Sequence, residues 1–170
     1  ENVHNRMIDE FKNINAKIAG ISCYTPEYYE TLKLARDIRR FNSSCKIIVG
    51  GIHPTFYPEE FFNIEERLVD FCVVGEGEVT VYELVECLAG RNKKKLEQIP
   101  GIVYRQDNSS ELVTTVKRLP VDSLDEISYP DYSLIDMNYY SNANPYAIRG
   151  VFLRSMYISS TRGCPSQCSF

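Results

Sequence analysis

The sequence lacks several features that would point to particular classes of protein. No apolar run reaches the roughly 18 residues that a membrane-spanning helix needs, and no signal peptide opens the chain. Basic residues are not in excess, because 19 Lys and Arg stand against 23 Asp and Glu, for a net charge of -4. Such a chain would release few counterions from a phosphate backbone, so no nucleic-acid partner is expected. There is also no internal repeat and no low-complexity tract.

The composition that remains is typical of a globular protein. Hydrophobic residues make up 44% and charged residues 25% of 170 residues, enough for one domain of ordinary size plus an appendage. Four of the six cysteines, Cys23, Cys45, Cys72 and Cys87, stand in or beside apolar stretches and are predicted to be core residues. Reduced thiols without a signal peptide favour a cytoplasmic location. The first residue is Glu1 rather than Met, which favours a fragment or a processed chain.

Short apolar runs alternate with amphipathic segments along the first half of the chain. Buried strands are predicted over 17–23, 45–51 and 69–74, and helices over 6–15, 25–41, 58–68 and 79–90. Thr25 is expected to cap the second helix, with Pro26 in its first turn. The last of these helices is expected to bury Val81, Leu84, Val85 and Leu88 and to end at Gly90. Apolar strands separated by helices indicate a doubly wound parallel α/β sheet covered on both faces.

The chain changes in character after Gly90. Residues 99–115 are predicted to form two strands joined by a polar turn at 107–110. Residues 119–150 are rich in Pro, Asn, Asp and Tyr without periodicity and are interpreted as a linker. A further strand is expected over 152–163, running into a cysteine-containing loop.

Right-handed crossovers place the loops that follow the parallel strands along one edge of the sheet, where ligands of such sheets bind. "YTPE", "GGIHPT" and "GEGE" should therefore meet there. Gly50 and Gly51 would allow a ligand to approach the backbone, although a glycine pair after a strand is weak evidence by itself. Ser22 could donate to a ligand or satisfy the next backbone amide. In "GEGE", the acidic residues Glu76 and Glu78 could contact a ligand or compensate the dipole of the following helix.

The two histidines are treated differently. His4 stands near the start of the chain and is given no role. His53, between Gly51 and Pro54, could be an axial metal ligand, but a loop histidine hydrogen-bonded to backbone is favoured.

Together these segments resemble the cobalamin-binding domain that precedes the radical domain of radical S-adenosylmethionine enzymes. The resemblance runs from about Ile18 to Phe170 and rests on the order of "GISCYTPEYY", "VGGIHPTFYPEE", "VDFCVVGEGEVTVYELV" and "SSTRGCPSQCSF". It implies a Rossmann-like sheet of the cobalamin-binding type without its first strands. It also implies a division into a partial cobalamin domain with a hairpin (1–118), a linker (119–150) and the start of a radical domain (151–170).

The resemblance implies roles for the rim residues. The family has a Ser-x-Leu step followed by a Gly-Gly turn, here Ser22 and Gly50-Gly51, with Tyr24 in place of the leucine. The serine would contact the nucleotide tail of cobalamin, and the glycines would let the tail pass. A cobalt-binding histidine motif, which this family usually lacks, would precede Glu1. The whole set expected near the cofactor is Ser22, Tyr24, Thr25, Gly50, Gly51, His53, Pro54, Thr55, Gly75, Glu76, Gly77 and Glu78.

Cys164 and Cys168 resemble the first two cysteines of the family's CxxxCxxC signature, whose third would follow Phe170. In the family these thiolates hold a 4Fe-4S cluster that binds S-adenosylmethionine and, with an electron from a donor, generates a radical that abstracts hydrogen from a small-molecule substrate. The expected protein is a methyltransferase or an oxidative cyclase-like enzyme, of which this chain alone would not be catalytically competent. The open alternative is a non-catalytic cofactor-binding module, or a doubly wound domain for another ligand, with an unrelated zinc or redox cysteine pair.

Overall fold

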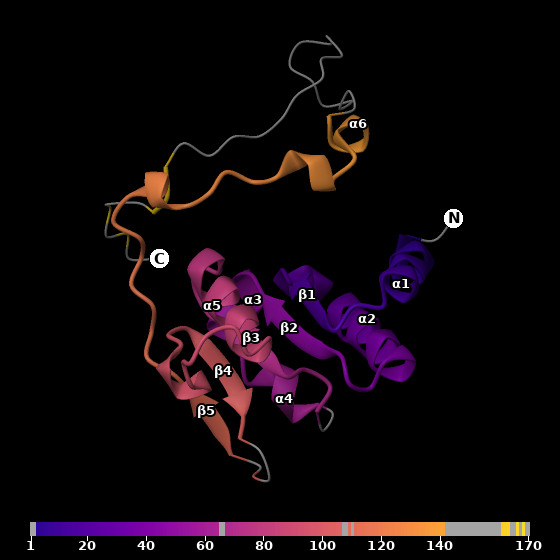
Figure 1. The fold of residues 1–170 in the computed structure, drawn as a ribbon, viewed down its shortest axis with the longest axis horizontal. Helices are drawn as coiled ribbons and strands as arrows, with labels where there is room; N and C mark the ends of the chain where they lie inside the picture. Colours follow the sequence, from indigo (N-terminus) through magenta and orange to yellow (C-terminus); the bar gives the residue numbers. More distant parts are fainter. Residues whose placement is uncertain are drawn as a thin grey trace. The chain divides into compact units, whose positions relative to one another are not determined.

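The computed structural model describes residues 3–64, 67–106, 109, 111–141, 161–163, 166 and 168. The chain divides into two compact units, Glu1–Pro120 and Val121–Phe170, which we call the sheet unit and the tail unit. The described elements of the tail unit are short helical turns: η3 Leu124–Glu126, η4 Tyr132–Leu134 and α6 Met137–Tyr140 (Figure 1). The strand predicted over 152–163 falls largely outside the described residues.

The sheet unit is built on a five-stranded mixed sheet in the order β1-β2-β3-β4-β5. The first three strands are parallel, as the sequence predicts, and the last two continue the sheet in antiparallel orientation. The predicted hairpin is therefore part of the same sheet, because β4 pairs with β3. The strands are β1 Ile18–Ser22, β2 Lys46–Gly50, β3 Phe71–Val73, β4 Ile102–Arg105 and β5 Leu112–Thr114.

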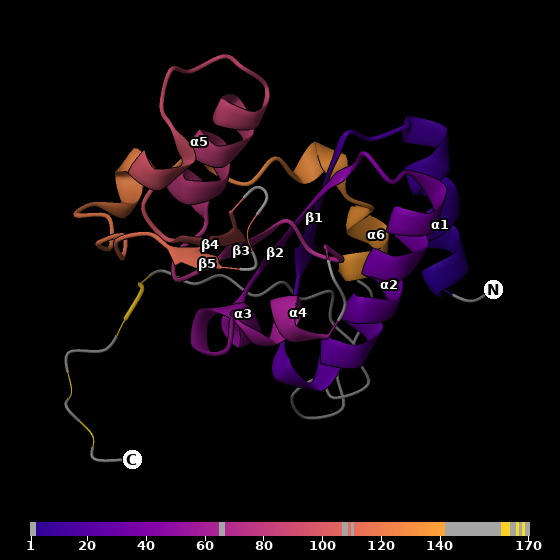
Figure 2. The same cartoon turned by 90° about the horizontal axis from the view of Figure 1, so that it is seen from below.

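Helices cover both faces of this sheet, with α5 on one face and α3 and α4 on the other (Figure 2). The residues of β2 show why: Ile47 and Val49 belong to the core cluster beneath α1, α2 and α4, while Ile48 belongs to the cluster beneath α5. Successive side chains of a strand point to opposite faces, so an apolar run supplies both cores. The helical elements are α1 Val3–Ile14, η1 Thr25–Glu27, α2 Tyr28–Phe41, α3 Ile52–Phe56, α4 Glu60–Asn63, α5 Glu78–Leu88 and η2 Leu96–Gln98.

The start of α2 differs from the prediction. Thr25 begins a 3-10 turn instead of capping the helix, and the N-cap of α2 is Glu27, whose side chain makes no capping bond. The Thr25 hydroxyl is engaged elsewhere, 3.2 Å from the ring of His53. The spacing of Tyr28, Leu32, Ala35 and Ile38 predicts that they line one face of the helix, and the structure buries the last three and leaves Tyr28 partly buried. The helix therefore depends on this apolar face rather than on a threonine cap.

The segment between β2 and β3 also differs from the prediction. One helix was expected over 58–68, but the structure has α4 over Glu60–Asn63 and an additional short helix, α3, where a loop was expected. Phe61 and Phe62 of α4 are buried, and a fully buried phenylalanine contributes about 2 kcal/mol. Two buried aromatic side chains in four residues pack this short helix onto the sheet without a longer amphipathic pattern.

Helix α5 presents a narrower buried face than its sequence suggests. Leu84 is fully buried, but Val81 is 38% exposed, and the polar Thr80 is buried instead. The Thr80 hydroxyl bonds the carbonyl of Pro100, which makes its burial acceptable. The helix ends one residue earlier than predicted, because its C-cap is Ala89, and Gly90 follows in the left-handed region (φ 69°).

Three of the four cysteines predicted to be core residues are fully buried. Cys23, Cys45 and Cys72 have no exposed surface, and burial raises the pKa of each thiol above its usual value. Cys87 is only half-buried, and its thiol donates to the carbonyl of Lys94. The buried thiols behave as small apolar side chains, as the sequence predicts.

Candidate functional site

The three loops that follow the parallel strands meet at one edge of the sheet, which we call the rim. The amide of Cys23 donates to the carbonyl of Gly50 (2.8 Å), and the amide of His53 donates back to the carbonyl of Cys23 (3.1 Å). The amide of Gly75 donates to the hydroxyl of Thr55 (3.1 Å), which joins the second loop to the third. The predicted convergence of "YTPE", "GGIHPT" and "GEGE" is confirmed.

Gly51 is the most constrained position of the rim. Its φ is 104°, in the left-handed region that favours glycine, and it is the N-cap of α3. A Cβ at Gly51 would stand 2.8 Å from the carbonyl oxygen of Cys23 and 3.2 Å from the hydroxyl of Ser22. At Gly50, by contrast, a Cβ would make only an ordinary contact at 3.8 Å with Val73. The close approach of the first two loops therefore requires glycine at position 51.

An apolar cleft of about 330 Å³ begins at this rim and runs between the first two strands and α5. Its volume lies at the small end of the range for ligand pockets. Gly20 leaves one part of the floor without a side chain, since a Cβ there would meet nothing within 4 Å. Val81, whose partial exposure contradicts its predicted burial, belongs to the wall. The lining residues are Ile18, Gly20, Ile21, Ser22, Ile48, Gly50, Gly51, Val81 and Val85.

Ser22 is the one hydroxyl-bearing residue of this lining. Its side chain is exposed, and within the described part of the chain no group hydrogen-bonds its hydroxyl. The alternative role considered for Ser22, satisfaction of the next amide, is not what the structure shows, because the amide of Cys23 bonds Gly50 instead. The hydroxyl can therefore donate to, or accept from, a molecule in the cleft.

His53 is buried, with 5% of its surface exposed. Its Nδ1 lies 3.2 Å from the Thr25 hydroxyl and its Nε2 lies 3.3 Å from a carboxylate oxygen of Glu60. The ring packs against Tyr28 and Phe61, with centroid distances of 4.7 Å and 5.6 Å. The ring thus contacts side chains rather than the backbone partner that we expected. Nδ1 has a hydrogen-bond partner, whereas Nε2 is buried without one despite its nearness to Glu60. The burial of the ring, rather than the pairing of its nitrogens, argues against an axial metal ligand.

The remaining rim residues have separate surroundings. Pro54 is fully buried beside His53, whereas Tyr24, at the start of the first loop, is 53% exposed. Gly75 has a φ of 82° with open space around it. Gly77 is the N-cap of α5, and Glu78 is an acidic residue in the first turn of that helix. This position suits dipole compensation. Ligand contacts of Gly75, Glu76, Gly77 and Glu78 remain predictions.

The cysteine pair of the tail is only partly within the described residues. Cys168 is exposed, and Cys164 lies outside them. Across the part of the chain that the structure describes, there is no cluster of three or more His, Cys, Asp or Glu side chains suited to a metal ion. The same part contains no helix with the length and apolar character needed to cross a membrane.

The sequence did not indicate two features of the site. The first is the cleft, which depends on Ile18 and Gly20 lying on the face of β1 that is turned toward α5. In the sequence, only the alternation of side chains between the two faces of a strand could have suggested this. The double role of Thr55, which bonds the carbonyl of Gly51 and the amide of Gly75, has no signature in the sequence.

Comparisons with known proteins agree with this geometry. Residues 2–85 match the family model described as the B12 binding domain. An uncharacterized methyltransferase of Pyrococcus horikoshii is 29% identical over 160 residues, which cover 94% of this chain and 32% of that protein. The anaerobic magnesium-protoporphyrin IX monomethyl ester cyclase of Synechocystis is 30% identical, over 90% of this chain and 28% of its own. The chain thus spans under a third of these relatives.

Solved structures show the same fold. The apo, selenomethionine-labelled structure of OxsB, a cobalamin-dependent S-adenosylmethionine radical enzyme, is 26% identical with a TM-score of 0.61, over 75% of this chain and 17% of that one. The structure of OxsB with aqua-cobalamin and S-adenosylmethionine bound has a TM-score of 0.67 over 90% of this chain and 23% of its own. At 22% identity, the second match shows the fold alone. Residues 2–85, just under half of the chain, thus match the B12-binding domain family.

Proposed function

We propose that the sheet unit binds cobalamin and that the apolar cleft receives the cofactor's nucleotide tail. The observation that carries this proposal is the cleft beside Gly51, where a glycine with positive φ brings the first two rim loops together. The benzimidazole base of the tail is flat and largely apolar, and the cleft walls are apolar apart from the hydroxyl of Ser22. The residues present therefore fit this group.

The residues of the cleft have distinct tasks in this proposal. Ser22 offers a hydroxyl that no described protein group uses, so it can hydrogen-bond a polar atom of the tail. Gly20 and Gly50 keep the floor free of side chains, and Val81 and Val85 exclude water from the wall. Bound cobalamin would supply a cobalt centre able to carry a methyl group. His53 is not proposed as a cobalt ligand, because its ring is buried against Thr25 and Glu60.

For the whole protein we propose a cytoplasmic cobalamin-dependent radical S-adenosylmethionine enzyme that acts on a small molecule as a methyltransferase or an oxidative cyclase. The support is the pattern of Cys164 and Cys168 and the names of the similar proteins, which include methyltransferases and a cyclase. These cysteines would supply two ligands of a 4Fe-4S cluster, which needs an electron donor. Soft thiolates suit iron–sulfur chemistry. Bound zinc instead of iron and sulfide after anaerobic reconstitution of the full-length protein would favour the alternative.

Titration with two forms of the cofactor tests cobalamin binding. The chain is titrated with hydroxocobalamin and, in parallel, with cobinamide, which has the same corrin but no nucleotide tail. Binding is followed through the corrin absorption. We expect saturable binding of hydroxocobalamin, and at least tenfold weaker binding of cobinamide, because the apolar cleft would stay unfilled. Equal affinities would contradict the placement of the tail, and absence of binding by both would contradict the proposed function.

A further inference from the structure

Thr55 connects two rim loops through a single hydroxyl group. Its Oγ1 donates to the carbonyl of Gly51 at 2.7 Å and accepts the amide of Gly75 at 3.1 Å. A threonine hydroxyl has one proton and two lone pairs, so donation to Gly51 leaves a lone pair for the Gly75 amide. The two bonds orient the hydroxyl and join the loop after β2 to the loop after β3.

The hydrogen bond from Thr55 to Gly51 would not by itself indicate a role in joining the loops. Threonine commonly bonds the carbonyl four residues earlier in a helix, and Thr55 stands in that relation to Gly51. The bond from Gly75 is different, because it comes from a loop 20 residues away in sequence. Gly75 has a φ of 82°, a backbone conformation that favours glycine. A Cβ at this position would meet nothing within 4 Å, so glycine is favoured here by the backbone conformation and not by a lack of space.

His53 makes the corresponding connection between the second loop and the first. Its amide bonds the carbonyl of Cys23, and its Nδ1 lies within hydrogen-bonding distance of the Thr25 hydroxyl. On its other side, Nε2 lies 3.3 Å from a carboxylate oxygen of Glu60 in α4 but makes no hydrogen bond. The ring is wedged between Tyr28 and Phe61, so it cannot turn without disturbing the packing.

We propose that His53 and Thr55 are positioning residues that act as one clasp: His53 holds the first rim loop to the second, and Thr55 holds the second to the third. The element that they position is Gly51, which stands against Cys23 and Ser22 at the mouth of the cleft. Neither side chain is then a contact of the cobalt, although both belong to the motif "GGIHPT". The clasp depends on the contacts alone, whereas its effect on the cofactor rests on the proposed function.

Amide hydrogen exchange tests the clasp without any cofactor. Thr55→Val keeps the shape of the side chain but removes the hydroxyl, and Thr55→Ser keeps the hydroxyl. We expect the Gly75 amide to exchange about tenfold faster in Thr55→Val and at the original rate in Thr55→Ser. The neighbouring amide of Val74, which bonds the carbonyl of Gly101, is the internal control and should not change. An unchanged rate for Gly75 in Thr55→Val would overturn the clasp.

Cofactor titration then tests the positioning role. We expect about tenfold weaker binding of hydroxocobalamin by Thr55→Val and less than twofold weakening by Thr55→Ser, while binding of cobinamide changes in neither variant. A loss of stability alone would weaken both ligands together. If Gly75 exchanges faster but hydroxocobalamin affinity is unchanged, the positioning role is wrong. If the unaltered chain binds neither ligand while Gly75 still responds, the clasp stands and the proposed function fails.

His53→Phe tests the other half of the clasp, since it keeps an aromatic ring between Tyr28 and Phe61 but removes both nitrogens. We expect about tenfold weaker binding of hydroxocobalamin and an unchanged absorption spectrum of the bound corrin. A change in that spectrum would show that His53 ligates the cobalt, and unchanged affinity would show that its link to Thr25 does not position the rim. Either result overturns the assignment of His53.

Discussion

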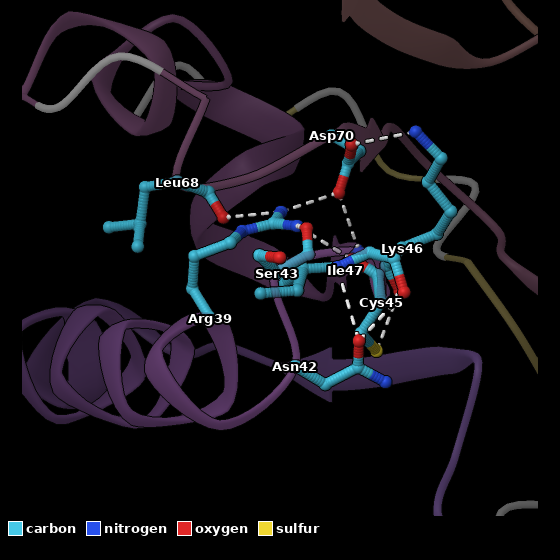
Figure 3. A network of polar contacts seen from close by, with 9 residues as sticks. Arg39, Asn42, Ser43, Cys45, Lys46, Ile47, Leu68 and Asp70 are labelled. Atoms are coloured by element: carbon cyan, nitrogen blue, oxygen red, sulfur yellow. Dashed lines mark hydrogen bonds and ion pairs between the residues drawn. The ribbon is translucent and has the colours of Figure 1, made fainter.

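The two ends of the parallel strands are built from different chemistry. At the rim, the loops are held by amides, carbonyls and the side chains of Thr55 and His53, and the cleft that begins there is apolar. At the opposite end, the guanidinium of Arg39 donates to the carbonyls of Cys45 and Leu68 and to the carboxylate of Asp70 (Figure 3). Asp70 in turn accepts the amide of Ile47 and pairs with Lys46. We call this group the Arg39–Asp70 network.

The difference concerns chemistry rather than space. A second cavity, also of about 330 Å³, opens at the end of the sheet where the Arg39–Asp70 network lies. Its lining includes charged side chains such as Lys46, Arg67 and Asp70. There the guanidinium of Arg39 donates to two loop carbonyls, and the carboxylate of Asp70 accepts the amide of Ile47 in β2. At the rim, backbone groups and a free hydroxyl remain beside an apolar cleft. From this comparison we expect the Arg39–Asp70 network to contribute more to stability and the rim to contribute more to ligand binding.

The strongest effect on stability is expected at the Arg39–Asp70 network. Asp70→Ala leaves the partly buried guanidinium of Arg39 and the amide of Ile47 without their acceptor, and we expect the free energy of unfolding to fall by about 3 kcal/mol. Urea unfolding measures this loss. Lys46→Gln is the matched control, because the Lys46 side chain is 49% exposed and its ion pair should contribute less than about 0.5 kcal/mol.

Affinity for hydroxocobalamin should not change in either of these variants while they are folded. Equal losses of stability in the two would show that the network is an ordinary surface contact.

A smaller loss of stability, with a large loss of binding, is expected at the rim. Gly51→Ala places a methyl group 2.8 Å from the carbonyl of Cys23 in a backbone conformation with φ 104°, so we expect about 2 kcal/mol of destabilisation and no measurable cobalamin binding. Gly20→Ala is the comparison, since its methyl group would meet nothing within 4 Å. It should leave unfolding within about 0.5 kcal/mol and weaken only cobalamin binding, because the methyl group occupies the cleft. Similar destabilisation by both would argue against special strain at Gly51.

The weakest effect is expected on the outer side of α5. Burial raises the pKa of the Glu83 carboxyl, but hydrogen bonds from Lys94 and Arg118 outweigh burial, so its pKa lies below the usual value. A lowered pKa means that the folded state is stabilised by the ionised form above the unfolded pKa, and that this contribution is lost as the pH falls through the folded pKa.

We therefore expect Glu83→Gln to lower the free energy of unfolding by about 1 kcal/mol at pH 7, with the difference from the unaltered chain vanishing in acid. Urea unfolding between neutral and acidic pH measures it. Affinity for hydroxocobalamin should stay the same, since the cleft uses Val81 and Val85 on the other side of the helix. A difference that persists below the folded pKa would show that Glu83 acts through packing rather than through charge.

Much of the site could be predicted from short local patterns. The apolar runs around Ile47 and Phe71 predicted parallel strands, and parallel strands bring the loops that follow them to one edge. Patterns failed where a residue's partner is distant in sequence. Thr25 was expected to cap a helix but contacts His53, and Val81 was expected to be buried but lines the cleft.

Sequence patterns were sufficient for the α/β class and the order of the rim loops, because each depends on the pattern of neighbouring residues, whereas the need for glycine at position 51 comes from its contacts with Ser22 and Cys23. Three features required the folded chain: β4 extends the sheet, Gly20 faces α5 across an apolar cleft, and the hydroxyl of Thr55 serves both Gly51 and Gly75. A hydrogen bond or a cleft wall needs two groups at a defined distance. Local patterns specify each group, but only packing of the whole sheet sets the distance between them.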